Sequence, residues 1–322
     1  MKRSLPLLLA AVLLAACSKD EPVLPGEGEN NGGGFTEVTI DTSDRQLIIT
    51  EQASASIMIY DQPSRKLLWE WTASDSAIPA SRQKWFRLPD EARTVYNRTC
   101  LLVTASGGGA ALIRIRDKKV LFYAKPDGNP HSAEVLPDNN IVVASSDGYL
   151  TVYECDTVRC YAKDFLSRTE LASAHNVVWD RSRGCLWSAG GESMHRYAYA
   201  DGQLTLVRST PLPAGCGDAH DLTPVYGTDQ LLLSTNSRCF RYDPTTDTAA
   251  ETQSFQQHAI KSISTGPFGY TTVCTRPTES WWSPEVLNFS SGVQLFFMRD
   301  YRIYKARWRV ETPFSYPERH EL

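Results

Sequence analysis

The sequence lacks several patterns that would assign a chemistry directly. Eight cysteines occur, and none of them belongs to a C-x-x-C pair, which argues against a zinc ribbon or a thioredoxin-like site. There is no stripe of basic side chains, and the formal net charge is −4 at pH 7, so nucleic acid is not expected as a partner. No amphipathic pattern is long enough to indicate a substantial helix. What remains is a chain of short β-prone runs.

The N-terminus carries an apolar run, Leu5 to Leu14, behind the basic residues Lys2 and Arg3. This run is too short to span a bilayer, and residues 1–16 are therefore predicted to be a signal peptide. The segment that ends at Cys17 resembles a bacterial lipobox, in which the cysteine is lipidated after cleavage. A secretory signal with a chance cysteine is the alternative.

Residues 17–34 are predicted to be the lipidated cysteine followed by a flexible tether, because Pro, Gly, Glu and Asn dominate after position 21. Ser18-Lys19-Asp20-Glu21 resembles the acidic export tag of surface lipoproteins. We therefore expect an outer-membrane protein that is anchored through Cys17 and exposed at the cell surface.

The body of the chain is a repeat. Residues 131–163 contain four short β-prone runs separated by turn residues, which is typical of one propeller blade. A similar second strand recurs six times, starting at Leu47, Leu101, Ile141, Cys185, Leu231 and Tyr270.

The spacing of these repeats predicts an all-β fold, a β-propeller of six four-stranded blades over residues 35–311. Residues 312–322 are predicted to be a loose tail. One strand near residues 302–308 is surplus. It is compatible either with ring closure against residues 35–40 or with the start of a seventh blade.

Four segments resemble a family of Bacteroidota surface lipoproteins that contain a β-propeller domain of unknown function. They are Val103-Thr-Ala-Ser-Gly-Gly-Gly, Gly128-Asn-Pro-His-Ser-Ala-Glu, Val142-Val-Ala-Ser-Ser and Ile303-Tyr-Lys-Ala-Arg-Trp. The resemblance implies a fold and a location. It implies no activity and no catalytic residue.

Four of the six histidines fall near the start of the predicted innermost strand of consecutive blades: His131, His175, His220 and His258. Equivalent positions in a propeller surround the central channel, so these imidazoles are expected at one mouth. Arg93 belongs to the corresponding place in the second unit, and Glu134 and Asp221 are expected to support the rings. The histidines would be structural, would line a ligand site, or would hold a divalent metal.

Trp281 and Trp282 are predicted to lie on the same face, because loops between second and third strands share it with the loops that enter the first strands. Exposed aromatic rings beside charged groups suit a flat ligand such as a sugar, and the alternative is that the tryptophans plug the mouth or cover a blade edge. The sequence thus favours a non-enzymatic protein that binds a glycan, a peptide or an envelope protein at this mouth and needs no cofactor. The alternatives are a metal-dependent lyase or hydrolase acting on carbohydrate, and a pure scaffold.

Cys155 and Cys160 flank a predicted hairpin turn. A cross-strand disulfide is compatible with this spacing, and two reduced thiols are equally compatible.

Overall fold

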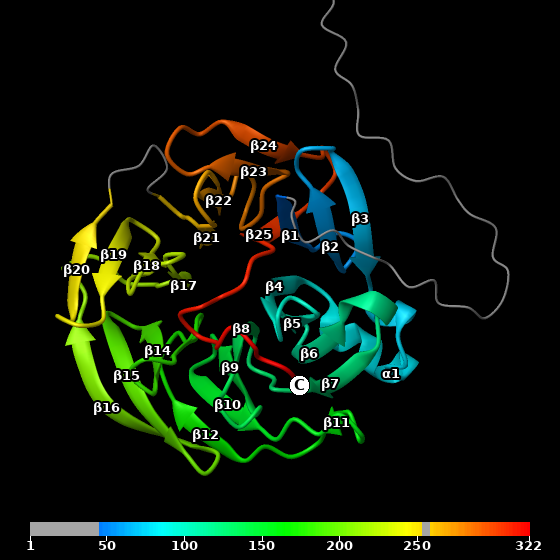
Figure 1. Ribbon diagram of the computed structural model, residues 1–322, viewed down its shortest axis with the longest axis horizontal. Helices are drawn as coiled ribbons and strands as arrows, with labels where there is room; N and C mark the ends of the chain where they lie inside the picture. The colour runs from blue at the N-terminus through cyan, green and yellow to red at the C-terminus, as the bar shows by residue number, and fades with distance from the viewer. Residues whose placement is uncertain (1–44, 253–257) are drawn as a thin grey trace, which may run out of the picture.

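Six β-sheets are arranged as blades around a common axis (Figure 1). The computed structural model describes residues 45–252 and 258–322, and the predicted signal peptide, lipidation site and tether lie outside these residues. Five sheets have four strands, and the sixth carries an additional short parallel strand. The predicted six-bladed propeller is confirmed.

The strands of each blade follow from the axis outward. Blade 1 contains β25 (Ile303–Trp308), β1 (Gln46–Glu51), β2 (Ser56–Asp61) and β3 (Lys66–Trp71), and blade 2 contains β4 (Pro89–Val95), β5 (Cys100–Ala105), β6 (Gly109–Arg114) and β7 (Val120–Ala124). Blade 3 contains β8 (Pro130–Val135), β9 (Ile141–Ser145), β10 (Tyr149–Tyr153) and β12 (Ser167–Glu170), and blade 4 contains β13 (Val178–Asp180), β14 (Cys185–Gly190), β15 (Ser193–Ala200) and β16 (Gln203–Pro211). Blade 5 contains β17 (Asp221–Pro224), β18 (Leu231–Ser234), β19 (Cys239–Asp243) and β20 (Thr248–Glu251), and blade 6 contains β21 (Ser262–Ser264), β22 (Val273–Thr275), β23 (Glu285–Asn288) and β24 (Gln294–Phe297).

The surplus strand closes the ring. β25, the last strand of the chain, pairs antiparallel with β1, the first strand that the structure describes, with Leu47 opposite Trp308 and Ile49 opposite Ala306. The strand is therefore the innermost strand of blade 1 and not the start of a seventh blade. Its expected partner, residues 35–40, lies outside the described residues.

Apolar side chains from both faces of each blade pack against the neighbouring blades. Trp187 of blade 4, for example, shares one cluster with Leu222 and Phe240 of blade 5. A strand that is covered on both faces is buried along its whole length, and its sequence is then apolar at successive positions. All six residues of β14 and all six of β5 are buried for this reason. The core is thus a series of layers between blades, and the inner strands are left free to line the axis with polar groups.

One β-prone run is a strand only in part, and one predicted strand is wrong. In residues 113–117, β6 ends at Arg114 and a 3-10 helix, η3 (Ile115–Asp117), follows, with Arg114 and Asp117 forming an ion pair across that turn. The fourth strand of blade 3 was expected at residues 159–163. The outer strand that pairs with β10 is β12 instead.

The segment around Cys155 and Cys160 leaves blade 3 altogether. β11 (Tyr161–Ala162) pairs with β7 of blade 2, in parallel orientation. Both cysteines are free thiols: the Cys160 Sγ lies 3.3 Å from the Thr157 carbonyl oxygen, and Cys155 packs against the cluster between blades 2 and 3. The cross-strand disulfide does not form because these residues do not face each other across a hairpin.

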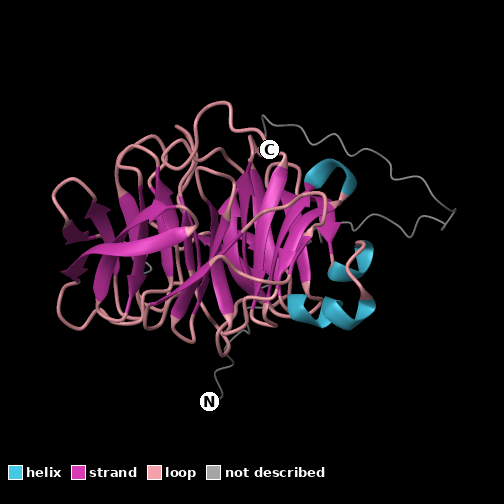
Figure 2. Cartoon of the chain, turned by 90° about the horizontal axis from the view of Figure 1, so that it is seen from below, coloured by secondary structure: helices cyan, strands magenta, loops and turns pink. Residues whose placement is uncertain are grey.

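All inner strands run in the same direction, so the propeller has two distinct open faces. We call the face where the inner strands begin the histidine face, and the opposite one the tail face, because residues 310–322 cross it (Figures 1 and 2). Ser315 and Tyr316 are buried, so the tail is packed and not loose. The only α-helix among the described residues, α1 (Ala80–Gln83), is a single turn, and none of the helices described is long and apolar enough to cross a membrane.

Candidate functional site: the polar mouth of the channel

A repeated backbone feature places one side chain per blade at the histidine face. In five blades, a residue in the left-handed conformation lies two positions before the side chain in question: Leu88 before Asp90, Asn129 before His131, Ser173 before His175, Asp218 before His220 and Ala259 before Lys261. In blade 1, the residue at the equivalent register position of β25 is Tyr304. We call Asp90, His131, His175, His220, Lys261 and Tyr304 the mouth ring.

At His131 and at His175, the left-handed turn also holds the imidazole by a hydrogen bond. The Asn129 carbonyl oxygen lies 2.9 Å from His131 Nδ1, and the Ser173 carbonyl oxygen lies 2.9 Å from His175 Nδ1. The turn before His131 requires Gly128, which has a φ of 64° and on which a Cβ atom would collide with the Tyr149 hydroxyl. The sequence Gly-Asn-Pro-His therefore orients a histidine through its local turn.

Three of the four predicted histidines come together. The ring centroids of His131 and His175 are 4.5 Å apart, and those of His175 and His220 are 5.4 Å apart. Tyr304 meets His131 edge-on at 5.6 Å, and the Lys261 ammonium lies 2.9 Å from His220 Nε2. The mouth is thus a chain of contacting polar rings that ends in a lysine.

His258 is not part of the mouth ring. It precedes the left-handed residue Ala259 and is exposed, and Lys261 takes the position that was predicted for it. In the described part of the chain, no three His, Cys, Asp or Glu side chains are arranged to hold a metal ion. The geometry therefore does not favour the predicted four-histidine metal site.

The imidazoles of the mouth ring are held in the neutral form. Burial lowers the pKa of His131 and His175 below the usual range, and burial together with Lys261 lowers the pKa of His220 to about 3. Because the Nδ1 of His131 and of His175 faces a carbonyl acceptor, the proton lies on Nδ1 and Nε2 is an acceptor. Burial and the nearby Lys305 lower the pKa of Lys261 to about 8, so Lys261 is the titrating donor of the mouth.

Trp281 is connected to the mouth ring through a glutamine. Trp281 Nε1 donates to Gln52 Oε1 at 2.9 Å, and Gln52 Nε2 donates to Asp90 Oδ1 at 3.3 Å. Half of the Trp281 surface is exposed, whereas Trp282 is half-buried beneath the Arg302 guanidinium at 5.2 Å. Trp281 is therefore available to a ligand, and Trp282 packs against the loop.

Below the mouth ring, six charged side chains fill the channel; we call them the central ion network. Asp221 accepts from Lys305 at 3.2 Å and from Arg307 at 2.5 Å, and Arg307 also bonds to Glu91. Arg93 bridges Glu91 at 2.7 Å and Glu134 at 2.9 Å. Arg93, Glu134 and Asp221 were predicted to meet a ligand, but they satisfy one another inside the channel: Glu134 and Asp221 are each only 1% exposed.

The network holds its charges through mutual neutralisation. Burial alone would raise the pKa of Glu91, but the cations Arg307, Arg93 and Lys305 outweigh it and hold that pKa below the usual range. Burial raises the pKa of Glu134 to about 7 against the opposing effect of Arg93. Three basic and three acidic side chains thus face one another in the buried centre of the channel.

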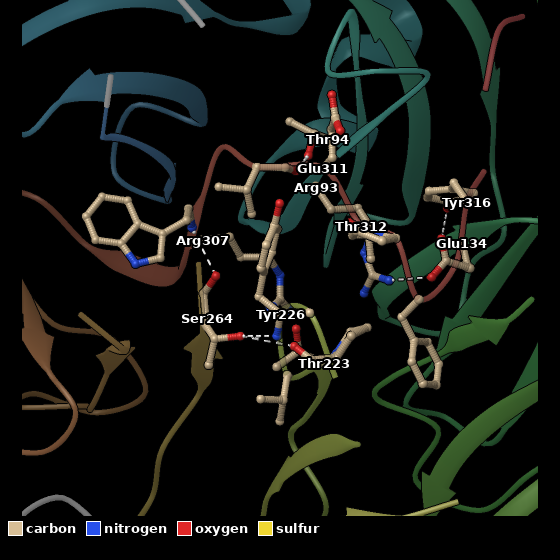
Figure 3. A pocket seen from close by; sticks show the side chains of 18 residues that line it. Arg93, Thr94, Glu134, Thr223, Tyr226, Ser264, Arg307, Glu311, Thr312 and Tyr316 are labelled. Carbon is tan, nitrogen blue, oxygen red and sulfur yellow. Dashed lines mark hydrogen bonds and ion pairs between the residues drawn. The ribbon is translucent and has the colours of Figure 1, made fainter. Parts of the chain in front are cut away.

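The tail closes the other end of the channel. The Tyr316 hydroxyl donates to Glu134 (Figure 3). The Thr94 hydroxyl donates to the Val310 carbonyl at 2.6 Å. Between the tail and Arg93, Glu134 and Arg307 lies a cavity of about 50 Å³, which has room for a few water molecules only. The channel is therefore a plugged core with one polar mouth and not a pore.

Sequence reasoning missed Lys261, Tyr304 and the two basic residues Lys305 and Arg307. The alternation in Ile303-Tyr-Lys-Ala-Arg-Trp was a usable signal, because two cations at every second position of a buried strand require acidic partners across the channel. The left-handed turn residue two positions before each mouth side chain has no comparable sequence signature, since it is Leu, Asn, Ser, Asp and Ala in turn.

Asp90 should make the stability depend on pH. Burial raises the pKa of its carboxyl to about 8, above its value in the unfolded chain, so this group stabilises the fold fully below about pH 4 and progressively less as the pH rises towards 8. The Asp90→Asn variant, which carries no carboxyl here, should therefore become more stable relative to the unmodified protein as the pH rises. Its unfolding free energy should gain up to about 1.4 kcal/mol per pH unit over that of the unmodified protein. Urea denaturation at pH 5, 6, 7 and 8 measures it. A difference that is the same at all four pH values would refute this role.

Taken together, the fold and the site define a six-bladed propeller with a sealed channel and a ring of polar side chains at one end of it. The chain belongs to a family of unknown function (DUF6528), whose model matches residues 2–322. No curated protein matches the sequence.

Among solved structures, the chain is similar to Kuenenia stuttgartiensis hydrazine synthase, with 13% identity and a TM-score of 0.54 over 82% of this chain and 83% of that one. It is also similar to a chain in the crystal structure of a mitotic checkpoint complex, with 12% identity and a TM-score of 0.51 over 74% and 73%. At these identities the likeness concerns the fold alone.

Proposed function

We propose that this protein is a non-enzymatic binding protein of the cell envelope and that it captures a saccharide at the mouth ring. The main observation in support is that the half-exposed Trp281 is hydrogen-bonded through Gln52 to Asp90, which belongs to the same ring as the neutral imidazoles. This combination offers an apolar surface for a sugar ring and hydrogen-bonding groups for its hydroxyls at the same place.

The pattern of donors and acceptors suits hydroxyl groups. Among the described residues, nothing hydrogen-bonds to Nε2 of His131 or of His175, so each presents a lone pair, while Lys261 supplies a cationic donor beside them. A hydroxyl both donates and accepts, and can therefore bridge an imidazole and the lysine ammonium. Because the imidazoles are neutral, an uncharged sugar can bind to them without having to balance a positive charge on the rings.

The envelope location rests on the order of the N-terminal segments. A basic start, a short apolar run, Cys17 and a segment rich in Gly and Pro would hold the propeller away from a membrane by a lipid and a tether. We propose that the protein is attached to the outer membrane through Cys17 and faces the cell exterior. Mass spectrometry of the purified native protein tests this: acyl chains on an N-terminal Cys17 are expected, and an unmodified mature N-terminus elsewhere would contradict it.

The binding proposal is tested with a panel of polysaccharides and oligosaccharides, measured by calorimetry. Trp281→Ala should weaken binding about tenfold, because the stacking surface is lost. Phe268→Ala is the matched control: Phe268 is a fully exposed aromatic residue in the loop between the first two strands of blade 6, and its loss should leave binding unchanged. Equal losses in both variants, or no binding to any member of the panel, would contradict the proposal and favour a scaffold.

The same binding should depend on pH through Lys261. Because the pKa of this lysine is about 8, affinity should fall as the pH rises from 7 to 9 and the ammonium loses its proton. In Lys261→Met, affinity should be lower at pH 7 and should no longer change over this range. A pH dependence that persists in this variant would assign the titration to another group.

A further inference from the structure

A large cavity lies on the tail face, on the opposite side of the molecule from the mouth ring. Its volume is about 690 Å³, and it lies against blade 2, where the turns after β4 and β6 meet the residue that follows β25 and the last residues of the tail. This volume lies in the range of small-molecule sites, which is roughly 300–1,000 Å³. The cavity under the tail beside Glu134 is far smaller.

The lining of this cavity is strongly basic. Five basic side chains contribute to it, against one acidic side chain, Glu321: they are Arg98, Arg114, Arg116, Lys119 and Arg309. Arg114 is neutralised by Asp117 at 2.5 Å, and Arg98 lies 3.8 Å from Glu311. Within residues 45–252 and 258–322, Arg116, Lys119 and Arg309 form no ion pair. We call this pocket the basic cavity.

Arg309 supplies a second, independent sign that a ligand belongs there. Its side chain is only 6% exposed, and its Nη1 and Nη2 atoms donate to Gln46 Oε1 at 3.0 Å and to the Arg98 carbonyl at 2.9 Å. Its Nε atom is buried with no hydrogen-bond partner. A buried charged donor without an acceptor is costly, and both neutral acceptors leave the charge itself uncompensated.

The pKa of Arg309 also indicates that its charge lacks a partner within the protein. Burial, reinforced by the neighbouring Arg98, lowers the pKa of the Arg309 guanidinium to about 10. In contrast, Arg307 two residues earlier has its carboxylate partners in the channel, and these raise its pKa despite its burial. Arg307, within β25, is therefore satisfied by the protein, whereas Arg309, directly after the end of β25, would be satisfied by an anion from outside.

We propose that the basic cavity binds a small polyanion, a molecule with at least two carboxylate, sulfate or phosphate groups. One oxyanion would accept from Arg309, and another would meet Arg116 and Lys119, which are both exposed at the opening. A planar guanidinium binds such oxyanions with two parallel hydrogen bonds, and two exposed cations draw the ligand in from solution. The cavity is large enough for a molecule of about two sugar rings.

Isothermal titration calorimetry on the full chain tests this site with four probes: inorganic phosphate, pyrophosphate, a sulfated disaccharide and digalacturonate. At least one doubly charged probe should bind, and inorganic phosphate should bind at least about tenfold more weakly than the best of them. The order of the other three identifies whether phosphate, sulfate or carboxylate is preferred. Affinity should fall several-fold between low and physiological salt.

Two variants separate a specific site from general attraction. Arg116→Gln combined with Lys119→Gln should weaken the best probe at least about tenfold, whereas Lys118→Gln, on the same turn but outside the cavity, should change it less than about twofold. Trp281→Ala should have no effect on this binding, which distinguishes the site from the mouth ring. Failure of every probe to bind more tightly than about 10 mM, or equal losses in the double variant and in Lys118→Gln, would overturn the proposal.

Discussion

Removal of the Asp221 carboxylate should lower the free energy of unfolding by about 3–5 kcal/mol, the usual cost of leaving buried charges without a partner. Asp221 is 1% exposed and accepts from Lys305, from Arg307 and, at 2.9 Å, from the backbone N–H of Ile263. In Asp221→Ala, two buried cations lose their nearest common anion, and Glu91 alone cannot neutralise both. Urea denaturation followed by circular dichroism measures the loss.

Asp229→Ala is the matched control for this variant. Asp229 also pairs with an arginine, Arg183, at 2.5 Å, but it is 56% exposed and its charge remains in water. Loss of an exposed pair costs at most about 1 kcal/mol. If the two variants were equally stable, the central ion network would not be a source of stability, and its role would have to lie elsewhere.

Deletion of residues 303–322 should abolish the cooperative fold. β25 is the innermost strand of blade 1 and forms one complete edge of β1, so its removal leaves β1 with an unpaired buried edge and opens the ring. The deletion also removes Lys305 and Arg307, which leaves Asp221 without its cationic partners and Glu91 with Arg93 alone. We expect a chain that aggregates, or one that unfolds without a sigmoidal transition in urea.

A shorter truncation tests whether this effect belongs to the strand. Deletion of residues 318–322 keeps β25 and Tyr316 and removes the stacking of His320 against Tyr96 and Tyr316, each with ring centroids 4.5 Å apart. This change should cost no more than about 1–3 kcal/mol and should leave the transition cooperative. A cooperative transition at the original midpoint after the longer deletion would show that the ring does not depend on β25.

The position of the mouth was largely predictable, and its composition was not. Histidines that recur at blade intervals identified the correct face, and His131, His175 and His220 are in contact there. The error at His258 arose because spacing alone cannot locate a turn to within three residues. In the structure the left-handed residue Ala259 precedes the inner strand of blade 6, so Lys261 enters the ring and His258 stays outside it.

The roles of Glu134 and Asp221 were also decided by contacts that are distant in the chain. They were expected beside the histidines as ligand-binding groups, but their partners come from other blades and from the tail: Arg307 lies opposite Asp221, and Tyr316 reaches Glu134. No local pattern connects residues that are more than 80 positions apart. Because these side chains pair with one another, the channel is filled by buried charged groups.

From sequence alone, the period of the β-prone runs determined the repeating blade, since short-range alternation and turn residues act within a few positions of each other. It predicted six blades and left a seventh open because of the surplus strand. Only the tertiary structure decided three features: the closure of the ring by β25, the pairing of residues 161–162 with the neighbouring blade, and the pairing of the charges in the channel. The physical reason is the same in each case: a strand edge or a buried charge must find a partner, and several partners satisfy the local sequence. Only the closed ring shows which of them is within reach.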